Sequence, residues 1–134
     1  MDGTFTNVET KMNFKPVSAS AGFIPFRGKS GWLGVGHTHY DFNHQTFEKN
    51  WGHHYTHMFF VIDNKFPYQV QKFSKEFCFL SPDLEVSFNI KDCELIQFVM
   101  SIFEYEGSVF LSYGANDCTS RIIQLSWNDI YNLF

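Results

Sequence analysis

Residues 32–39 (WLGVGHTH) show the alternation that is typical of a β-strand. Side chains of a strand point alternately to its two faces, so the even-numbered residues from Trp32 to Thr38 are expected on one face and the odd-numbered residues from Leu33 to His39 on the other. A turn-forming cluster at 27–31 (RGKSG) precedes this stretch, and a shorter apolar strand at 23–26 precedes the turn. This unit of strand, turn and strand sets the pattern for the rest of the chain.

Further short strands separated by turns are predicted along the chain, at residues 55–62, 68–73, 76–80, 95–103, 109–113 and 120–125. A hairpin turn is expected at Glu106–Gly107, and loops at 40–51 and 81–91. Ser126 should cap a short helix over 127–133, with Asp129 completing a capping box. About eight short strands at this spacing predict an all-β protein, which could be a sandwich, a barrel or a propeller.

Composition narrows the class of protein. The 134 residues fit one domain, and 44% hydrophobic with 18% charged residues is too apolar for a disordered chain and too mixed for a membrane protein. The net charge is −4 and the 10 basic residues form no cluster, so we expect no nucleic acid partner. No apolar run is long enough to span a bilayer, and residues 1–15 lack the apolar core of a signal peptide. We therefore expect no membrane partner and a cytoplasmic location.

Two further expectations concern the chain's organisation and its cysteines. Residues 1–22 are polar and small and are expected to be a leader or a covering strand, with the domain proper over 23–134. Cys78, Cys93 and Cys118 are an odd number of cysteines without metal-ligand spacing. Reduced thiols in a cytosolic setting are expected.

The histidines form the first group that could carry chemistry, because all six lie between His37 and His57. His37 and His39 share a strand face, and His57 follows Tyr55 at the same two-residue spacing. Three imidazoles converging from His37, His39 and His57 could hold zinc or iron. Alternatively, the histidines line a polar cleft or are buried with satisfied hydrogen bonds.

Residues 112–118 (SYGANDC) form the second group. A predicted strand ends there and turns through Asn116 and Asp117, two residue types that tolerate strained backbone. This is either an ordinary turn or one that projects Asp117 toward a cleft, where it could hold a pair of sugar hydroxyls. The chain has no glycine-rich phosphate loop, no G-x-S-x-G elbow and no CxxC motif. Pairing of Cys118 with a histidine has no local signature.

Several of these stretches together resemble a known family. Residues 31–37 (GWLGVGH) and 55–63 (YTHMFFVID) resemble one blade of a five-bladed β-propeller, residues 73–79 (FSKEFCF) resemble the segment that follows, and residues 93–99 with 109–118 resemble the closing blade. The chain from 23 to 134 is thus similar to the β-mannoside phosphorylases and related hydrolases of glycoside hydrolase family 130, and in particular to propeller domains found beside or fused to glycosyltransferases.

This resemblance implies a partial β-propeller of about two blades, built as antiparallel meanders with a short C-terminal helix. It implies that His37 and Tyr55 lie near phosphate or water at the anomeric carbon, and that Asp117 contacts the sugar. His57 and Asn116, on the same segments, complete the candidate substrate-binding residues. No catalytic residue, cofactor or metal is assigned. The chain departs from the family by having SAG at residues 20–22, where the family has Arg-Gly-Ser, and by supplying about two of five blades.

Three functions follow as hypotheses. The first is a carbohydrate-recognising, non-catalytic fragment of a glycosidase- or phosphorylase-type propeller linked to glycan metabolism. The second is a glycoside phosphorylase or hydrolase completed by a partner chain, since glycoside hydrolysis usually needs two carboxylates and Asp117 is one. The spare carboxylates Asp92 and Glu94 are expected to face solvent. The third is a small histidine-cluster metal-binding β-protein.

The expected ligand is a carbohydrate or a sugar phosphate. Two blades alone would leave strand edges and apolar faces uncovered, and soluble proteins rarely leave such surfaces exposed. We therefore expect a homo-oligomer or a complex with a partner propeller chain, unless residues 1–22 cover the edge.

Overall fold

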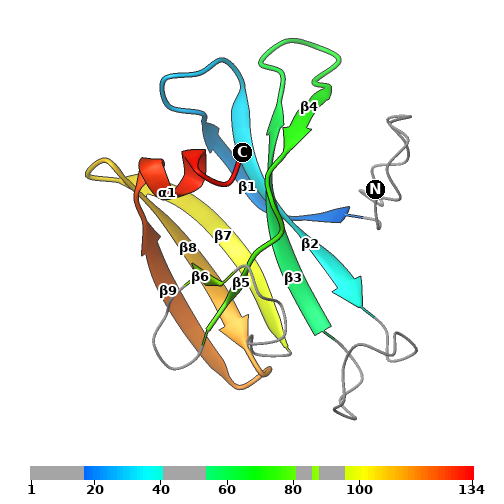
Figure 1. The fold of residues 1–134 in the computed structure, drawn as a ribbon, viewed down its shortest axis with the longest axis vertical. Coiled ribbons are helices and arrows are strands. Elements are labelled where there is room, and N and C mark those ends of the chain that lie inside the picture. Colours follow the sequence, from blue (N-terminus) through cyan, green and yellow to red (C-terminus); the bar gives the residue numbers. More distant parts are fainter. Residues whose placement is uncertain (1–16, 41–53, 81–85, 88–95) are drawn as a thin grey trace.

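The computed structural model describes residues 17–40, 54–80, 86–87 and 96–134. Strands dominate, with one short helix, so the predicted all-β class is confirmed (Figure 1). The strands form a four-stranded sheet, a three-stranded sheet and a two-stranded pair. Within this part of the chain, no helix has the length and apolar character needed to cross a membrane.

The first sheet is an antiparallel meander in the order β1-β2-β3-β4. Its strands are β1 (Val17–Pro25), β2 (Trp32–Tyr40), β3 (His54–Ile62) and β4 (Val70–Phe73). The β2–β3 pairing is uninterrupted over nine residue pairs, whereas β1 carries an irregularity between Ala19 and Phe23. Because β1 begins at Val17, the boundary expected between residues 22 and 23 falls inside a strand.

The second sheet is also an antiparallel meander, in the order β7-β8-β9. Its strands are β7 (Gln97–Tyr105), β8 (Ser108–Ala115) and β9 (Thr119–Leu125). Glu106 and Gly107 join β7 to β8 with positive φ angles of 47° and 78°, as the predicted hairpin turn requires.

The two-stranded pair consists of β5 (Cys78–Phe79) and β6 (Val86–Ser87). The strand β6 lies within residues 81–91, which were expected to be a loop, so that expectation was wrong at this point. Two residues are too few to show a strand alternation in the sequence.

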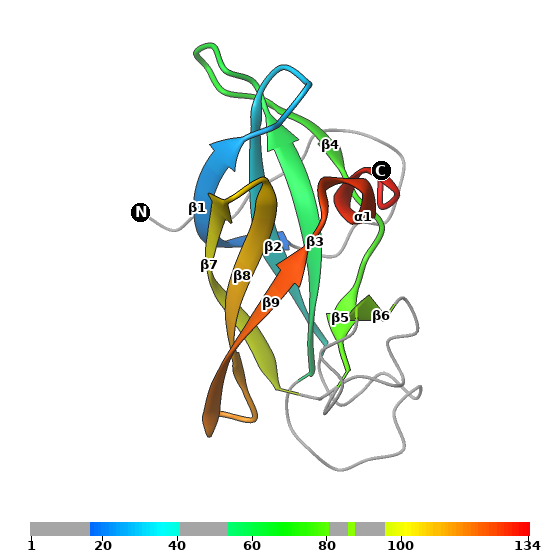
Figure 2. The same cartoon turned by 90° about the vertical axis from the view of Figure 1, so that its left-hand side faces the viewer.

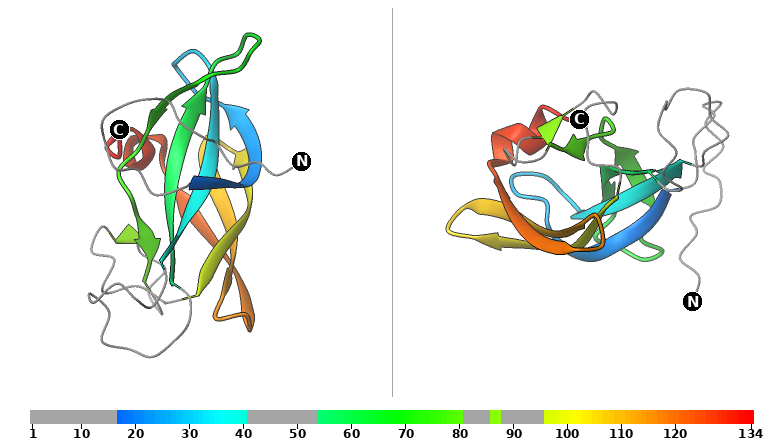
Figure 3. Two further views of the ribbon diagram at one scale, coloured as in Figure 1. Left: turned by 90° about the vertical axis from the view of Figure 1, so that its right-hand side faces the viewer. Right: turned by 90° about the horizontal axis from the view of Figure 1, so that it is seen from below.

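The core lies between the inner faces of the two sheets, which curve around it (Figure 3). As the alternation predicts, Leu33 and Val35 of β2 are fully buried in this core. Phe79 of β5 stacks on Tyr113 of β8 with ring centroids 4.3 Å apart, so the short pair closes the core from a third side. The strands β1 and β7 lie side by side where the two sheets meet (Figures 1 and 2).

The other face of the first sheet is closely packed around two glycines. A Cβ atom at Gly34 would lie 2.7 Å from the ring of Phe23 and 2.8 Å from that of Phe60. At Gly36, a Cβ atom would lie 2.7 Å from a methyl of Val17 and 2.9 Å from the Ser18 carbonyl oxygen. Both glycines are therefore needed so that neighbouring groups can cover β2.

The helix α1 (Trp127–Tyr131) follows β9 and begins as predicted. The Ser126 side chain accepts a hydrogen bond from the Asp129 backbone N–H, and the Asp129 carboxylate accepts one from the Ser126 backbone N–H, so the capping box is confirmed. Phe26, from the end of β1, lies among the rings of Trp127, Tyr131 and Phe134 at centroid distances of 5.6–6.1 Å. The helix is thereby packed onto the first hairpin.

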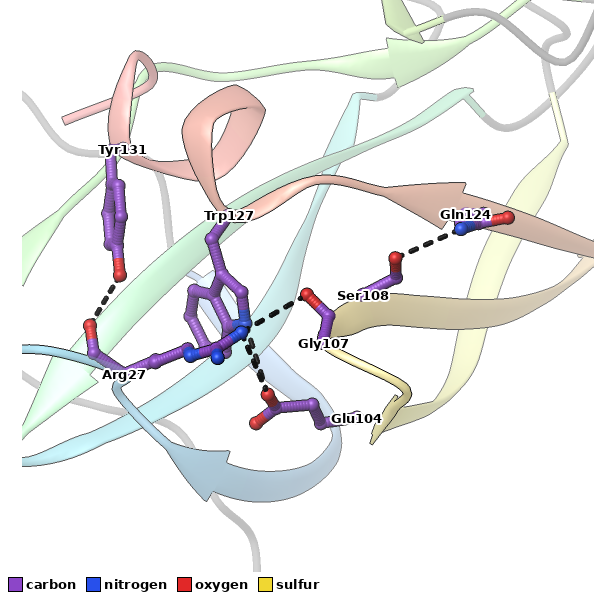
Figure 4. Close-up of polar contacts among 7 residues, drawn as sticks. All are labelled: Arg27, Glu104, Gly107, Ser108, Gln124, Trp127 and Tyr131. Carbon is purple, nitrogen blue, oxygen red and sulfur yellow. Dashed lines mark hydrogen bonds and ion pairs between the residues drawn. The ribbon is translucent and has the colours of Figure 1, made fainter.

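Polar contacts around α1 connect the two sheets (Figure 4). The Tyr131 hydroxyl donates to the Arg27 carbonyl oxygen, and the Trp127 indole N–H donates to a Glu104 carboxylate oxygen at 3.3 Å. The Arg27 guanidinium donates to the Gly107 carbonyl oxygen at 3.3 Å and lies 3.7 Å from Glu104. The β1–β2 turn, the β7–β8 hairpin and the helix are thus held together.

The cysteines differ from the expectation of reduced thiols. Cys78 is fully buried in β5 and is disulfide-bonded to a residue outside the described part of the chain. Cys118 is free and exposed. The expectation was wrong for Cys78, because an odd number of cysteines leaves one thiol unpaired without excluding a bridge between two others.

Candidate functional site

The site begins at His37, which lies half-buried in β2. Its Nδ1 atom is 2.8 Å from the hydroxyl of Ser20, in the irregular stretch of β1. Its ring lies 4.6 Å from that of Phe98 in β7 and 5.8 Å from that of Tyr55 in β3, centroid to centroid. Three strands from both sheets therefore meet around one imidazole.

Tyr55 and His39 extend this arrangement. They are direct partners in the β2–β3 pairing, so they share a sheet face, and their rings stack at 4.8 Å with an interplanar angle of 28°. Phe98 is 37% exposed and meets the Tyr55 ring edge-on at 6.1 Å. We call His37, His39, Tyr55 and Phe98 the aromatic cluster.

His57 lies opposite His37 in the β2–β3 pairing but is fully buried. The backbone N–H of Val99 donates to its Nε2 atom at 3.2 Å, and the rings of Phe77 and Phe79 lie 5.9 and 5.3 Å away. Burial, with a smaller contribution from His37, lowers the pKa of His57 to about 3. His57 is thus a neutral core residue without exposed surface in the described structure, and its predicted contact with substrate stays a prediction.

A metal site at His37, His39 and His57 does not form. Within the described ranges, no three side chains of His, Cys, Asp or Glu are placed to hold a metal ion. The physical reason is that His57 already accepts a hydrogen bond at Nε2 inside the core, while His39 is exposed. Asp92 and Glu94, the spare carboxylates, lie outside the described residues.

Asn116 and Asp117 form the β8–β9 turn, with φ angles of 54° and 51°. The Asn116 backbone N–H donates to the Ile96 carbonyl oxygen at 2.7 Å, which ties the turn to the start of β7. Both side chains are exposed. Since Ile96 is two residues before Phe98, the turn lies at the same end of the molecule as the aromatic cluster, the lower end in Figure 1.

The structure thus brings His37 and Tyr55 into ring contact and places Asn116 and Asp117 at the same end of the fold. Among the described contacts, neither turn side chain bonds to the aromatic cluster. Sequence reasoning missed Phe98 and Ser20, which complete the surroundings of His37. The sequence could have indicated Phe98 because Phe98 and Met100 are alternate residues of one strand and both face outward. This alternation can be recognised only once β7 is known to be a strand.

Within the aromatic cluster, the surroundings of His37 favour the uncharged imidazole. Burial, with a smaller contribution from His39, lowers the pKa of His37, so its imidazole is uncharged at neutral pH. An uncharged imidazole can donate at one nitrogen and accept at the other. Together with flanking ring faces, this combination suits a ligand that carries both hydroxyl groups and apolar C–H faces.

A concavity lies at the end of β2 and β3 opposite to the aromatic cluster. It is an open groove of about 320 Å³ lined by Phe23, Trp32, Ile62 and Tyr68. Its lining is almost entirely apolar, and Trp32 pairs with Ile62 at the end of the strand ladder remote from the His39–Tyr55 pair. It therefore belongs to a different part of the molecule from the aromatic cluster.

Comparison of the chain with models of protein families, with curated proteins and with solved structures finds no match. The functional argument is accordingly carried by the residues and geometry of the aromatic cluster.

Proposed function

We propose that this chain recognises carbohydrate without catalysis of its own, as a fragment of a glycosidase- or phosphorylase-type propeller linked to glycan metabolism. The observation that carries the proposal is the aromatic cluster, in which His37 contacts Tyr55 and Phe98 at the end of the molecule that also holds the Asn116–Asp117 turn. The resemblance to family 130 named His37, Tyr55 and Asp117 as site residues.

The chemistry of a sugar supports this choice. A pyranose ring presents C–H groups on its faces and hydroxyl groups around its edge, so it packs on aromatic rings while its edge takes hydrogen bonds. Sites for such ligands are mainly apolar, with a few placed polar groups that fix orientation. Phe98 and Tyr55 provide the rings, while His37 and the exposed amide and carboxylate of the β8–β9 turn provide the polar groups.

The blade interpretation has its own support. Propellers are built from antiparallel meanders of about four strands arranged around an axis, and the chain contains a four-stranded and a three-stranded meander packed face to face. The outer face of the second sheet exposes Met100, Phe103 and Ile122. We therefore propose that the protein is a homo-oligomer or a subunit beside a partner propeller chain, which sedimentation at micromolar concentration would show as a species heavier than 15.7 kDa.

The alternative function is a glycoside phosphorylase or hydrolase completed by a partner chain. Asp117 is exposed and supplies one carboxylate, while hydrolysis with two carboxylates or phosphorolysis requires a second group. The isolated chain should therefore release no nitrophenol from nitrophenyl glycosides, with or without phosphate. Turnover by the isolated chain, abolished by Asp117→Asn, would replace the first proposal with this one.

Cellular location is proposed from the sequence to be the cytoplasm. The disulfide at Cys78 provides its sharpest test, because thiols in the cytosol are kept reduced. Rapid alkylation of thiols in lysed cells should find Cys78 reduced if the protein is cytoplasmic. Full oxidation of Cys78 in cells would place the protein in an oxidising compartment instead.

The central test is binding of simple sugars. We expect saturation-transfer NMR to detect binding of at least one among the methyl pyranosides of glucose, mannose and galactose. His37→Ala should weaken that binding about tenfold, the effect of losing one well-placed hydrogen bond. His37→Gln, which keeps a donor and an acceptor, should lose less. Lys29→Ala, at an exposed position in the β1–β2 turn, is the control and should bind like the wild type.

A further inference from the structure

Gly114 is the second-to-last residue of β8, and among the described residues no packing contact requires a glycine there. A Cβ atom built there would meet nothing within 4 Å among the described residues, and its φ is not in the left-handed region. Gly114 pairs with Phe98 of β7 and with Ser120 of β9, and an irregularity in the β7–β8 pairing begins at the neighbouring residue Val99. Crowding among the described residues and positive φ, two common reasons for a glycine in a strand, are therefore absent at Gly114.

A glycine inside a strand weakens it, because the residue has high backbone freedom and no side chain to pack. One further reason for such a residue is close approach of a ligand to the backbone. The residues paired with Gly114 are of types that could contact such a ligand. Directly paired residues of antiparallel strands point to the same face, so Phe98, Gly114 and Ser120 form one row across the outer face of the second sheet.

The row consists of an exposed aromatic ring, an empty position and an exposed hydroxyl. Adjacent strands lie about 4.8 Å apart, so the Cα atoms of Phe98 and Ser120 are separated by roughly 10 Å, with the vacancy between them. This spacing leaves room for one six-membered ring beside Phe98. Phe98 also contacts His37, so the open position at Gly114 adjoins the aromatic cluster.

We infer that a pyranose ring of a neutral sugar lies over Gly114, packed beside Phe98 and within reach of the Ser120 hydroxyl. This inference rests on the proposed function, and it specifies both the place of the ring and its class. Phe98 and Gly114 would then determine which ligands fit, without taking part in any reaction.

The neutral class follows from the charges around the row. Arg121 pairs with Tyr113, a core residue, so it belongs to the opposite face of the sheet. The remaining basic residues of the described chain lie in the β1–β2 turn, between β3 and β4, or in β4 and the segment after it: Arg27, Lys29, Lys65, Lys72 and Lys75. On this face of the sheet, a phosphate group would therefore meet no described Lys or Arg, since Arg121 at the same end belongs to the other face.

The experiment uses substitutions that the fold should tolerate. Gly114→Val adds a side chain where there is space, and Gly22→Val does the same in β1, where a Cβ atom also meets nothing within 4 Å. Both variants should melt close to the wild type. Titration with the methyl pyranosides of glucose, mannose and galactose should show at least tenfold weaker binding for Gly114→Val and an unchanged affinity for Gly22→Val.

Phe98 provides the second arm of the experiment. Phe98→Ala should weaken binding at least tenfold, while Phe98→Tyr, which keeps the ring, should retain most of it. Phe103→Ala removes another partly exposed ring of the same strand and should leave binding unchanged. Glucose 1-phosphate should bind more weakly than methyl glucoside.

The outcomes separate this inference from the function on which it rests. Wild-type affinity in Gly114→Val, with the His37→Ala effect intact, would overturn the position over Gly114 and leave carbohydrate recognition standing. Tighter binding of glucose 1-phosphate than of methyl glucoside would overturn the neutral class. A wild-type protein that binds none of the three glycosides would overturn the proposed function and this inference together. If Gly114→Val melts well below the wild type, the position is not open, and the ring position over Gly114 is overturned.

Discussion

Gly34 and Gly36 of the first sheet have surroundings opposite to those of Gly114 in the second sheet. In the first sheet, Gly34 and Gly36 lie under neighbouring side chains, and a single added carbon would clash with Phe23 or Val17. In the second sheet, Gly114 lies in the open beside an exposed ring. Gly34 and Gly36 are explained by the protein's own packing, whereas no packing contact among the described residues explains Gly114.

The same contrast holds for the faces of the sheets. In the part of the first sheet around Gly34 and Gly36, both faces are covered, because Leu33 and Val35 lie in the core while the glycines are covered from the other side. The second sheet alternates strictly in β8, with core residues on one face and partly exposed residues on the other. The open face of the second sheet is therefore where we expect ligands and partners.

The largest effect should come from removing a core ring that connects the sheets. Phe79→Ala removes a fully buried ring stacked on Tyr113 and should lower the free energy of unfolding by about 3–5 kcal/mol. Phe103→Ala, on the open face, removes a ring stacked only on Phe110 at 5.3 Å and should cost less than about 1.5 kcal/mol. Urea unfolding measures both, and equal losses would contradict the distinction between the two faces.

The next effect compares the glycines directly. Gly36→Val should lower the free energy of unfolding by about 1–3 kcal/mol or more, since the new side chain meets the Ser18 carbonyl oxygen, which cannot move without its strand. Gly114→Val should be neutral or slightly stabilising, because β-branched residues favour strands. A melting temperature that falls equally in the two variants would remove the basis for the ligand position proposed over Gly114.

The acid stability of the core should depend on His57. Its pKa is about 3 in the folded protein and 6.5 as the ordinary value, so above pH 6.5 both states are neutral and the residue has no effect. Between pH 6.5 and 3 the unfolded chain binds a proton that the folded chain does not. The folding equilibrium constant should therefore fall up to tenfold for each pH unit as the pH decreases.

The variant His57→Gln tests this pH dependence, because it keeps an acceptor for the Val99 N–H and cannot titrate. Its unfolding free energy, measured in urea from pH 7 to 4, should change less steeply with pH than that of the wild type. Parallel pH profiles would show that His57 is not responsible.

The smallest effect concerns the thiols of the two regions. Cys118, exposed in the turn of the second sheet, should be the one thiol that reacts with Ellman's reagent before reduction. After reduction in denaturant, all three cysteines should react. Cys118→Ser should leave no reactive thiol without reductant and should not change stability measurably. Two or more reactive thiols in unreduced wild-type protein would contradict the disulfide at Cys78.

The sequence predicted the local features of the fold well. Alternation identified β2 and β3 and placed Leu33 and His37 on the same face, and the short-range signals of the hairpin turn and the capping box were equally readable. These features depend on residues that are near one another in the chain, so their chemistry is visible in the sequence.

The features that it did not predict depend on distant contacts. His57 and Tyr55 follow the same alternation, yet His57 is buried and Tyr55 is half-exposed. The difference arises because the segment that contains Phe77 pairs with β3 at His57. The same holds for the disulfide at Cys78 and for the contact of Phe98 with His37. Each joins segments that are distant in the sequence, and no local pattern predicts that they meet. The burial of a side chain in a strand thus depends on which distant segment packs against it, and the sheet face that it occupies is not sufficient to predict it.

The packing of α1 on the first hairpin has a consequence for synthesis of the protein. Tyr131 forms a hydrogen bond with Arg27, 104 residues earlier in the sequence. Phe26 packs against the same helix and is uncovered until that helix forms. At translation rates of 5–20 residues per second, the ribosome makes these partners on the order of 5–20 s apart. Throughout that interval the nascent first sheet presents an uncovered aromatic ring, so chaperone binding during translation should depend on how quickly α1 emerges from the ribosome.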